Sequence, residues 1–268
     1  MSEMHVYRFG PGMTDGKADM KNLLGGKGAN LAEMALLEIP VPPGCTITTE
    51  VCTFFNENGK TYPKELEQQL KNALKDVEKS VGAIFGDQKN PLLLSVRSGA
   101  RASMPGMMET VLNVGLNDFT RNGLIEQSGD ARFVFDAQRR LIQMYSDVVM
   151  EKASGIEPEE GMGIRNQLEH ELEKMKEQVG VTEDTDLSAT NLEDLVEIYK
   201  GKVLEVLKKP FPEDPWEQLW GAISAVFHSW DGKRAKAYRK IENIPEEWGT
   251  AVNVQAMVYG NLGDDSAT

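Results

Sequence analysis

The sequence predicts an α+β fold with a mostly helical insertion, because the spacing of its apolar residues changes along the chain. Short apolar runs at Val6–Phe9 and Pro91–Arg97 are typical of strands, while residues 64–81 show helical spacing. From about Phe119 the spacing becomes helical, and strand character returns over Thr250–Tyr259. These observations divide the chain into a mixed first part, a helical middle part and a last strand.

In the first part, glycine and proline residues separate the predicted elements. The first strand ends at Gly10-Pro11-Gly12, and residues 39–44 form a rigid turn because proline fits neither a helix interior nor a central strand. The elements predicted there are strands at Val6–Phe9, Thr46–Thr48 and Pro91–Arg97 and helices at residues 29–37, 49–56 and 64–81.

The middle part is predicted to consist of amphipathic helices with charged outer faces. The linker at residues 184–191 is rich in Asp, Ser, Thr and Asn, which are preferred residues at a helix N-cap. The predicted helices are residues 133–148, 165–179, 191–208, 216–230 and 233–241.

The domain boundaries follow from the same change in spacing. We expect residues 1–117 and 216–249 to form one α/β lobe and residues 118–215 to form the helical insertion. The strand at Thr250–Tyr259 runs into a turn of Gly, Asp and Ser, which ordinarily leads to an antiparallel partner. Two interpretations stay open, a last strand at a sheet edge and a chain cut inside a domain. An unpaired edge here would favour association.

Composition excludes several classes of protein. Of the 268 residues, 40% are hydrophobic and 26% are charged, so collagen-like, low-complexity and wholly disordered chains are excluded. We expect no membrane partner, since no run of about 18 apolar residues predicts a transmembrane helix, and residues 1–20 lack the apolar core of a signal peptide. Cys45 and Cys52 are the two cysteines, and two packed thiols fit a reducing, cytoplasmic location.

The charge is strongly negative and uneven. The formal net charge is −13, with 12 Lys/Arg against 13 Asp/Glu in residues 1–110 and 17 against 29 in the remainder. An acidic chain repels phosphate backbones, so a nucleic acid is not an expected partner. An anionic ligand is expected in the near-neutral first part, held by a local arrangement of cations.

The first such arrangement is Gly25-Gly26-Lys27-Gly28, which runs into a helix. Glycines allow close approach of a ligand, a helix N-terminus offers unpaired N–H groups, and lysine adds a full charge, which together suit phosphate. The segment is not a Walker A loop, because Lys21 and Gly28 occupy positions where that motif needs glycine and Ser or Thr. The alternative is a glycine turn with a solvated lysine.

The second arrangement is the segment from Ser95 to Thr110. Arg97 is predicted to lie at the end of a buried strand, and Arg101 follows it in the loop. A guanidinium group can bind two oxygens of one phosphate at the same time. The hydroxyls of Ser98, Ser103 and Thr110 lie beside them in the sequence. A surface loop with solvent-facing arginines is the alternative.

Other motifs carry weaker signals. Gly260 and Gly263 could form a glycine lid over phosphates, or an ordinary turn. The basic stretch at residues 233–240 is interpreted as a solvated helix face, and His228 as a packed core residue. No histidine has metal-ligand spacing with cysteine, so no metal site is predicted.

Three stretches resemble the pyruvate, phosphate dikinase family. They are Asn22–Met34, Val41–Thr49 and Ser95–Met108, and further similarity at residues 143–150 and 248–260 extends the resemblance over essentially the whole chain. Phosphoenolpyruvate synthases share the glycine-lysine opening and the arginine strand but have a different loop afterwards. The resemblance implies an incomplete nucleotide-binding domain of the ATP-grasp type, of which residues 250–268 would begin the second lobe.

The resemblance also implies roles for single residues. Lys27 and Arg97 match the family's lysine and arginine on the ATP phosphates, and both are candidate catalytic residues. The loop at residues 98–110 matches a mobile segment of the family's phosphate site. Gln255 matches a position on a strand that lines the nucleotide pocket. The candidate nucleotide-binding residues are Lys27, Arg97, Arg101, Ser103, Thr110, Gln255, Gly260 and Gly263.

The family's reaction converts ATP, phosphate and pyruvate into AMP, pyrophosphate and phosphoenolpyruvate through a phosphohistidine, with Mg²⁺. The resemblance implies that the magnesium ligands, the phosphorylated histidine, the pyruvate-binding barrel and a homodimer contact lie beyond residue 268. The chain alone is therefore expected to be inactive. Three alternatives stay open. The chain could be the nucleotide-binding part of a phosphoenolpyruvate synthase-like phosphotransferase, a nucleotide-binding protein that phosphorylates a different acceptor through a separate subunit, or an inactive interaction module.

Overall fold

The computed structural model describes residues 3–259, which fall into two compact units. The first unit comprises, among the described residues, 3–85, 92–110 and 223–258. The second comprises residues 86–91, 111–222 and, among the described residues, Tyr259. Helices and strands occur together along the chain, which confirms the α+β class. No helix within residues 3–259 has the length and apolar character needed to cross a membrane.

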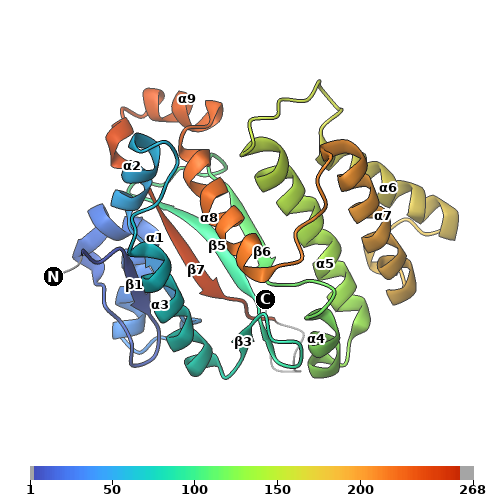
Figure 1. Cartoon of the computed structure of the whole chain (residues 1–268), viewed down its shortest axis with the longest axis horizontal. Helices are drawn as coiled ribbons and strands as arrows, with labels where there is room; N and C mark the ends of the chain where they lie inside the picture. Colours follow the sequence, from blue (N-terminus) through green and yellow to red (C-terminus); the bar gives the residue numbers. More distant parts are fainter. Residues whose placement is uncertain (1–2, 260–268) are drawn as a thin grey trace. The chain divides into compact units, whose positions relative to one another are not determined.

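Four antiparallel strands form the sheet of the first unit, in the order β1-β2-β7-β5. Figure 1 labels β1, β7 and β5 of this sheet. On β7, Gln255 pairs with Gly44 on one side and with Ser95 on the other. The expectation of an unpaired strand at residues 250–259 is therefore wrong, because both sides of β7 are hydrogen-bonded within the sheet. The strands are β1 Val6–Phe9, β2 Gly44–Ile47, β5 Leu94–Ala100 and β7 Thr250–Ala256.

One face of this sheet is apolar and covered by helices. Arg8 of β1 projects toward the same side, and its Nη1 forms an ion pair of 2.7 Å with Asp76, which places α3 on this face. The helices are α2 Thr49–Glu57 and α3 Leu66–Val81. The buried apolar residues that alternate along the strands are Cys45, Ile47, Val96, Val252 and Val254.

The remaining helices of the first unit are α1 Lys21–Leu36, α9 Lys233–Ile241 and the second half of α8 Pro215–Trp230. Short elements are 3-10 turns at Ala18–Met20 and Glu246–Trp248 and the strands β3 Ile84–Phe85 and β4 Pro91–Leu92, of which β4 spans the unit boundary. The predicted helices at residues 64–81, 216–230 and 233–241 agree with α3, α8 and α9 to within two residues.

The second unit is mainly helical, as the spacing predicts. In α7 the buried residues recur at helical intervals, and its N-cap Ser188 forms a capping box with Asn191, as expected for the polar linker. Its elements are β6 Thr110–Val114, α4 Arg121–Ser128, α5 Ala131–Tyr145, a π-helix at Ser146–Lys152, α6 Ile164–Val179, a 3-10 turn at Asp184–Asp186, α7 Ala189–Leu207 and the first half of α8.

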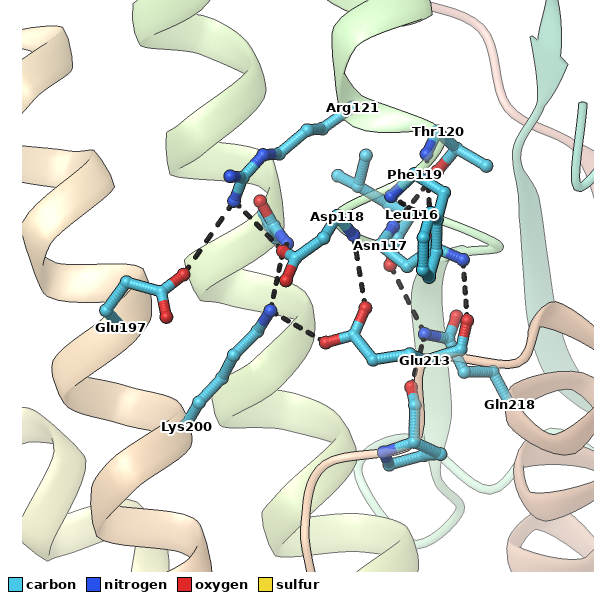
Figure 2. A network of polar contacts seen from close by, with 12 residues as sticks. Leu116, Asn117, Asp118, Phe119, Thr120, Arg121, Glu197, Lys200, Glu213 and Gln218 are labelled. Atoms are coloured by element: carbon cyan, nitrogen blue, oxygen red, sulfur yellow. Dashed lines mark hydrogen bonds and ion pairs between the residues drawn. The ribbon is translucent and has the colours of Figure 1, made fainter. Parts of the chain in front are cut away.

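A polar network around the loop before α4 ties the segments of the second unit together (Figure 2). Lys200 of α7 donates 2.6 and 2.7 Å contacts to the carboxylates of Asp118 and Glu213. Gln218 of α8 accepts a hydrogen bond from the backbone N–H of Gly115 at 2.8 Å. The network therefore joins three segments distant in sequence and has a structural role.

Asp118 is expected to make the second unit sensitive to acid. Burial raises its pKa, but the hydrogen bond and charge of Lys200, with help from Gln138 and Arg121, outweigh burial and lower it. The ionised Asp118 carboxylate therefore stabilises the folded state fully above the ordinary pKa of about 3.9. This stabilisation is lost as pH falls through the lower folded-state pKa.

Urea unfolding measured from pH 6 down to about pH 2 tests this. Because the Asp118 side chain is 39% exposed, the effect should be modest, about 1 kcal/mol or less. Wild-type protein should lose more stability on acidification than Asp118→Asn, which has no carboxylate to protonate. Equal losses in the two proteins would contradict the assignment.

Candidate functional site

The glycine-lysine segment lies directly against the end of β5. Helix α1 is interrupted at Gly25, whose φ of 67° and ψ of 172° are not helical. A Cβ atom at Gly25 would lie 1.6 Å from the carbonyl oxygen of Gly99, and one at Gly26 would lie 3.6 Å from that of Ala100. Only glycine allows this approach at Gly25, so the sequence places Lys27 beside the loop that follows β5.

Part of the sheet face beneath α1 is polar. Arg97, Asn253 and Thr46 are paired across β5, β7 and β2, and residues directly opposite in antiparallel strands project to the same face. Gly28 lies over them, since a Cβ atom there would be 2.8 Å from both side-chain branches of Thr46. Small residues in α1 thus bring its backbone close to the sheet.

Lys27 and Arg97 come together on this polar face. Both side chains are exposed, and the pKa of Lys27 is lowered by partial burial of its side chain and by the charge of Arg97. Within residues 3–259, no carboxylate forms an ion pair with either of them. Two neighbouring cations without a counter-charge produce a positive potential that attracts anions.

A contrasting arginine shows what a structural ion pair looks like in this unit. Arg8 lies in a hollow of about 190 Å³ between β1 and α3. It binds Asp15 at 2.8 Å and Asp76 at 2.7 Å, so its charge is already neutralised. That hollow therefore lacks the free positive charge found at Lys27 and Arg97.

Arg101 lies in the loop after β5, against an aromatic ring. Its guanidinium carbon is 5.5 Å from the ring centre of Trp248, a cation–π contact. Its Nε is buried and has no hydrogen-bond acceptor among the described residues.

The other predicted residues differ in burial and in hydrogen-bond partners. Ser103 is exposed, and its backbone carbonyl accepts a 3.5 Å hydrogen bond from the Tyr238 hydroxyl. Thr110 is half-buried at the start of β6. Gln255 shares the polar face but is 8% exposed, and its Nε2 donates to the carbonyl of Pro42 at 3.0 Å. Gly260 and Gly263 lie outside the described residues.

No group of three or more His, Cys, Asp or Glu side chains within residues 3–259 could hold a metal ion. Cys45 and Cys52 are free and buried, and burial raises the pKa of each thiol to about 12. His228 packs edge-on against Phe55 with ring centres 5.2 Å apart, as expected for a packed residue.

Sequence reasoning missed three residues at this site, namely Thr46, Asn253 and Trp248. A signal for Asn253 exists, because a polar residue alternates with Val252 and Val254 in a strand that is buried on both faces. No comparable signal identifies Trp248, because its contact with Arg101 joins segments far apart in the sequence.

Comparison with known proteins adds a family to this geometry. A family model described as "Pyruvate phosphate dikinase, AMP/ATP-binding domain" matches residues 21–65 and 58–267. The matched ranges include both cations, Lys27 and Arg97.

Single relatives agree with the family match. The pyruvate, phosphate dikinase of Rhizobium meliloti (strain 1021) is 53% identical over 263 residues, covering 98% of this chain and 28% of the relative. The pyruvate, phosphate dikinase of Clostridium symbiosum is 49% identical over 264 residues, covering 98% of this chain and 28% of the relative. Pyruvate, phosphate dikinase 1, chloroplastic, of Arabidopsis thaliana is 50% identical over 269 residues, covering 100% of this chain and 27% of the relative. The chain thus spans just over a quarter of these relatives' length, and it belongs to the pyruvate phosphate dikinase family, whose AMP/ATP-binding domain it carries.

Proposed function

We propose that the chain binds the phosphates of ATP at Lys27 and Arg97, as the nucleotide-binding part of an enzyme that converts ATP, phosphate and pyruvate into AMP, pyrophosphate and phosphoenolpyruvate. The observation that carries the proposal is the pair of neighbouring cations without a carboxylate partner in the described residues. Family membership supports the adenine nucleotide as the ligand.

The proposed chemistry of these residues is electrostatic. Phosphoryl transfer spreads negative charge over the transferred group, so fixed cations stabilise it and hold it in position. Lys27 would contribute a point charge and Arg97 a planar pair of donors. Arg101, Ser103, Thr110 and Gln255 are proposed to line the remainder of the site, and Gly260 and Gly263 to close over the phosphates.

Further parts of the proposal rest on the family alone. The domain is proposed to be of the ATP-grasp type, with residues 1–117 and 216–249 as its first lobe, residues 118–215 inserted, and residues 250–268 leading into a second lobe. Mg²⁺ would accompany ATP and neutralise phosphate charge. Residues 3–259 contain no group of three or more His, Cys, Asp or Glu side chains that could hold it. A cytoplasmic homodimer is proposed for the whole protein.

Calorimetric titration with ATP, ADP, AMP and adenosine tests the proposal. For ATP we expect weak binding, with a Kd on the order of 100 µM, which corresponds to a binding free energy of about −5.5 kcal/mol. Affinity should fall as phosphates are removed, because the phosphates face the two cations. Equal affinity for ATP and adenosine would contradict the proposal, and an absence of binding would favour an inactive interaction module.

A further inference from the structure

Two buried polar side chains lie beneath the glycine-lysine segment. Thr46 and Asn253 are each 1% exposed, and the Thr46 hydroxyl donates a 2.8 Å hydrogen bond to Oδ1 of Asn253. They lie 207 residues apart in the sequence, on the adjacent strands β2 and β7. Asn253 is also the residue paired with Arg97 on β5.

This pair fills the space that two glycines leave open. A Cβ atom at Gly28 would lie 2.8 Å from Oγ1 of Thr46 and 3.0 Å from Oδ1 of Asn253. A Cβ atom at Gly99 would lie 2.6 Å from Nδ2 of Asn253. Gly28 follows Lys27 directly and Gly99 is two residues after Arg97, so the pair supports the backbone next to both cations.

Core packing alone does not explain these polar groups. Nδ2 of Asn253 is buried without an acceptor among residues 3–259, and an unsatisfied buried donor costs free energy. The neighbouring positions Val252 and Val254 show that the same strand uses apolar residues on its other face. A polar residue at such a cost is expected where it holds a specific neighbour in position.

We infer that Thr46 and Asn253 are positioning residues, which hold the glycine-lysine segment and β5 at the spacing that lets Lys27 and Arg97 bind the phosphates of one ATP molecule. Both side chains are buried, so we expect them to act through the backbone next to them. The expected effect on ATP affinity rests on the proposed function. The support that the two side chains give to the glycine-lysine segment does not depend on any ligand. It assigns roles to two residues outside the glycine and arginine motifs.

Amide hydrogen exchange of the unliganded chain tests the structural part. In Asn253→Ala and Thr46→Val, the amides of residues 25–30 should exchange roughly tenfold faster, the equivalent of about one lost hydrogen bond. Thr46→Ser, which keeps the hydroxyl, should exchange like wild-type protein. Val254→Ala is the matched control, because it opens a cavity on the other face of β7 and should leave residues 25–30 unchanged. Thr46→Val is close to isosteric and decides the matter should Asn253→Ala not fold.

ATP titrations of a double-mutant cycle test the consequence. Asn253→Ala should weaken ATP binding about tenfold, and adding Lys27→Ala to it should cost less than Lys27→Ala costs in wild-type protein, because the lysine is already misplaced. Exchange at residues 25–30 that matches the Val254→Ala control, or strictly additive losses of affinity, would overturn the inference. Wild-type protein that fails to bind ATP while the exchange results hold would refute the proposed function and leave the positioning role established.

Discussion

Replacing Gly25 with alanine is expected to lower the free energy of unfolding by about 2–6 kcal/mol, the sum of a strained backbone and an overpacked contact. The backbone at this position has φ of 67°, and the new Cβ would lie 1.6 Å from the carbonyl oxygen of Gly99. Because Gly99 belongs to the sheet, the glycine-lysine segment has to move away from β5. Thermal unfolding should show the loss, and ATP titration should show that binding is lost with it.

Gly59→Ala is the matched control for this substitution. Gly59 has φ of 64° in the same unit, but nothing lies within 4 Å of the position its Cβ would take. It should therefore show only the backbone strain, about 1–2 kcal/mol, and bind ATP normally. A Gly25→Ala protein as stable as Gly59→Ala would mean that the close contact with Gly99 does not hold the segment.

Removing either cation is expected to weaken ATP binding strongly. A hydrogen bond to a charged group contributes about 1.5–3 kcal/mol, so Lys27→Ala and Arg97→Ala should each raise Kd by roughly 10- to 150-fold. Thermal stability should change little, because both side chains are exposed and neither has a carboxylate partner within the described residues. Titration calorimetry at constant ionic strength measures both variants.

Lys71→Ala and Arg165→Ala serve as controls of equal charge change. Lys71 forms an exposed pair with Glu67 on α3, and Arg165 forms one with Glu169 on α6. Both should bind ATP as tightly as wild-type protein does. Losses of affinity as large as those of Lys27→Ala would show that net charge, and not the site, controls binding.

Periodicity predicts most helices of this fold, but it cannot predict strand order. Residues 64–81, 165–179 and 191–208 carry apolar residues at helical spacing, and helices begin and end there to within about two residues. The strand at residue 250 was expected to be unpaired because its neighbours in sequence offer no partner. Its partners are residues 44–47 and 94–100, and such long-range pairing leaves no local signal.

At the candidate site, too, some residues can be predicted from the sequence and others only from the structure. Glycine and arginine motifs predict Lys27 and Arg97 because their chemistry is visible in the residue types. The contact between Gly25 and Gly99, and the pair of Thr46 and Asn253 below it, depend on how α1 lies on the sheet. No spacing along the chain encodes that arrangement, so the supporting residues become visible only in the structure.

We propose above all that Lys27 and Arg97 bind the phosphates of the same ATP molecule, and NMR of their side chains tests this most directly. Protein labelled with ¹⁵N and ¹³C in lysine and arginine is titrated with ATP and, separately, with adenosine, and signals are assigned with Lys27→Ala and Arg97→Ala. We expect ATP to shift the Lys27 and Arg97 signals with one common Kd, while adenosine leaves both unchanged. Shifts confined to other lysines and arginines, or different Kd values for the two side chains, would contradict the claim.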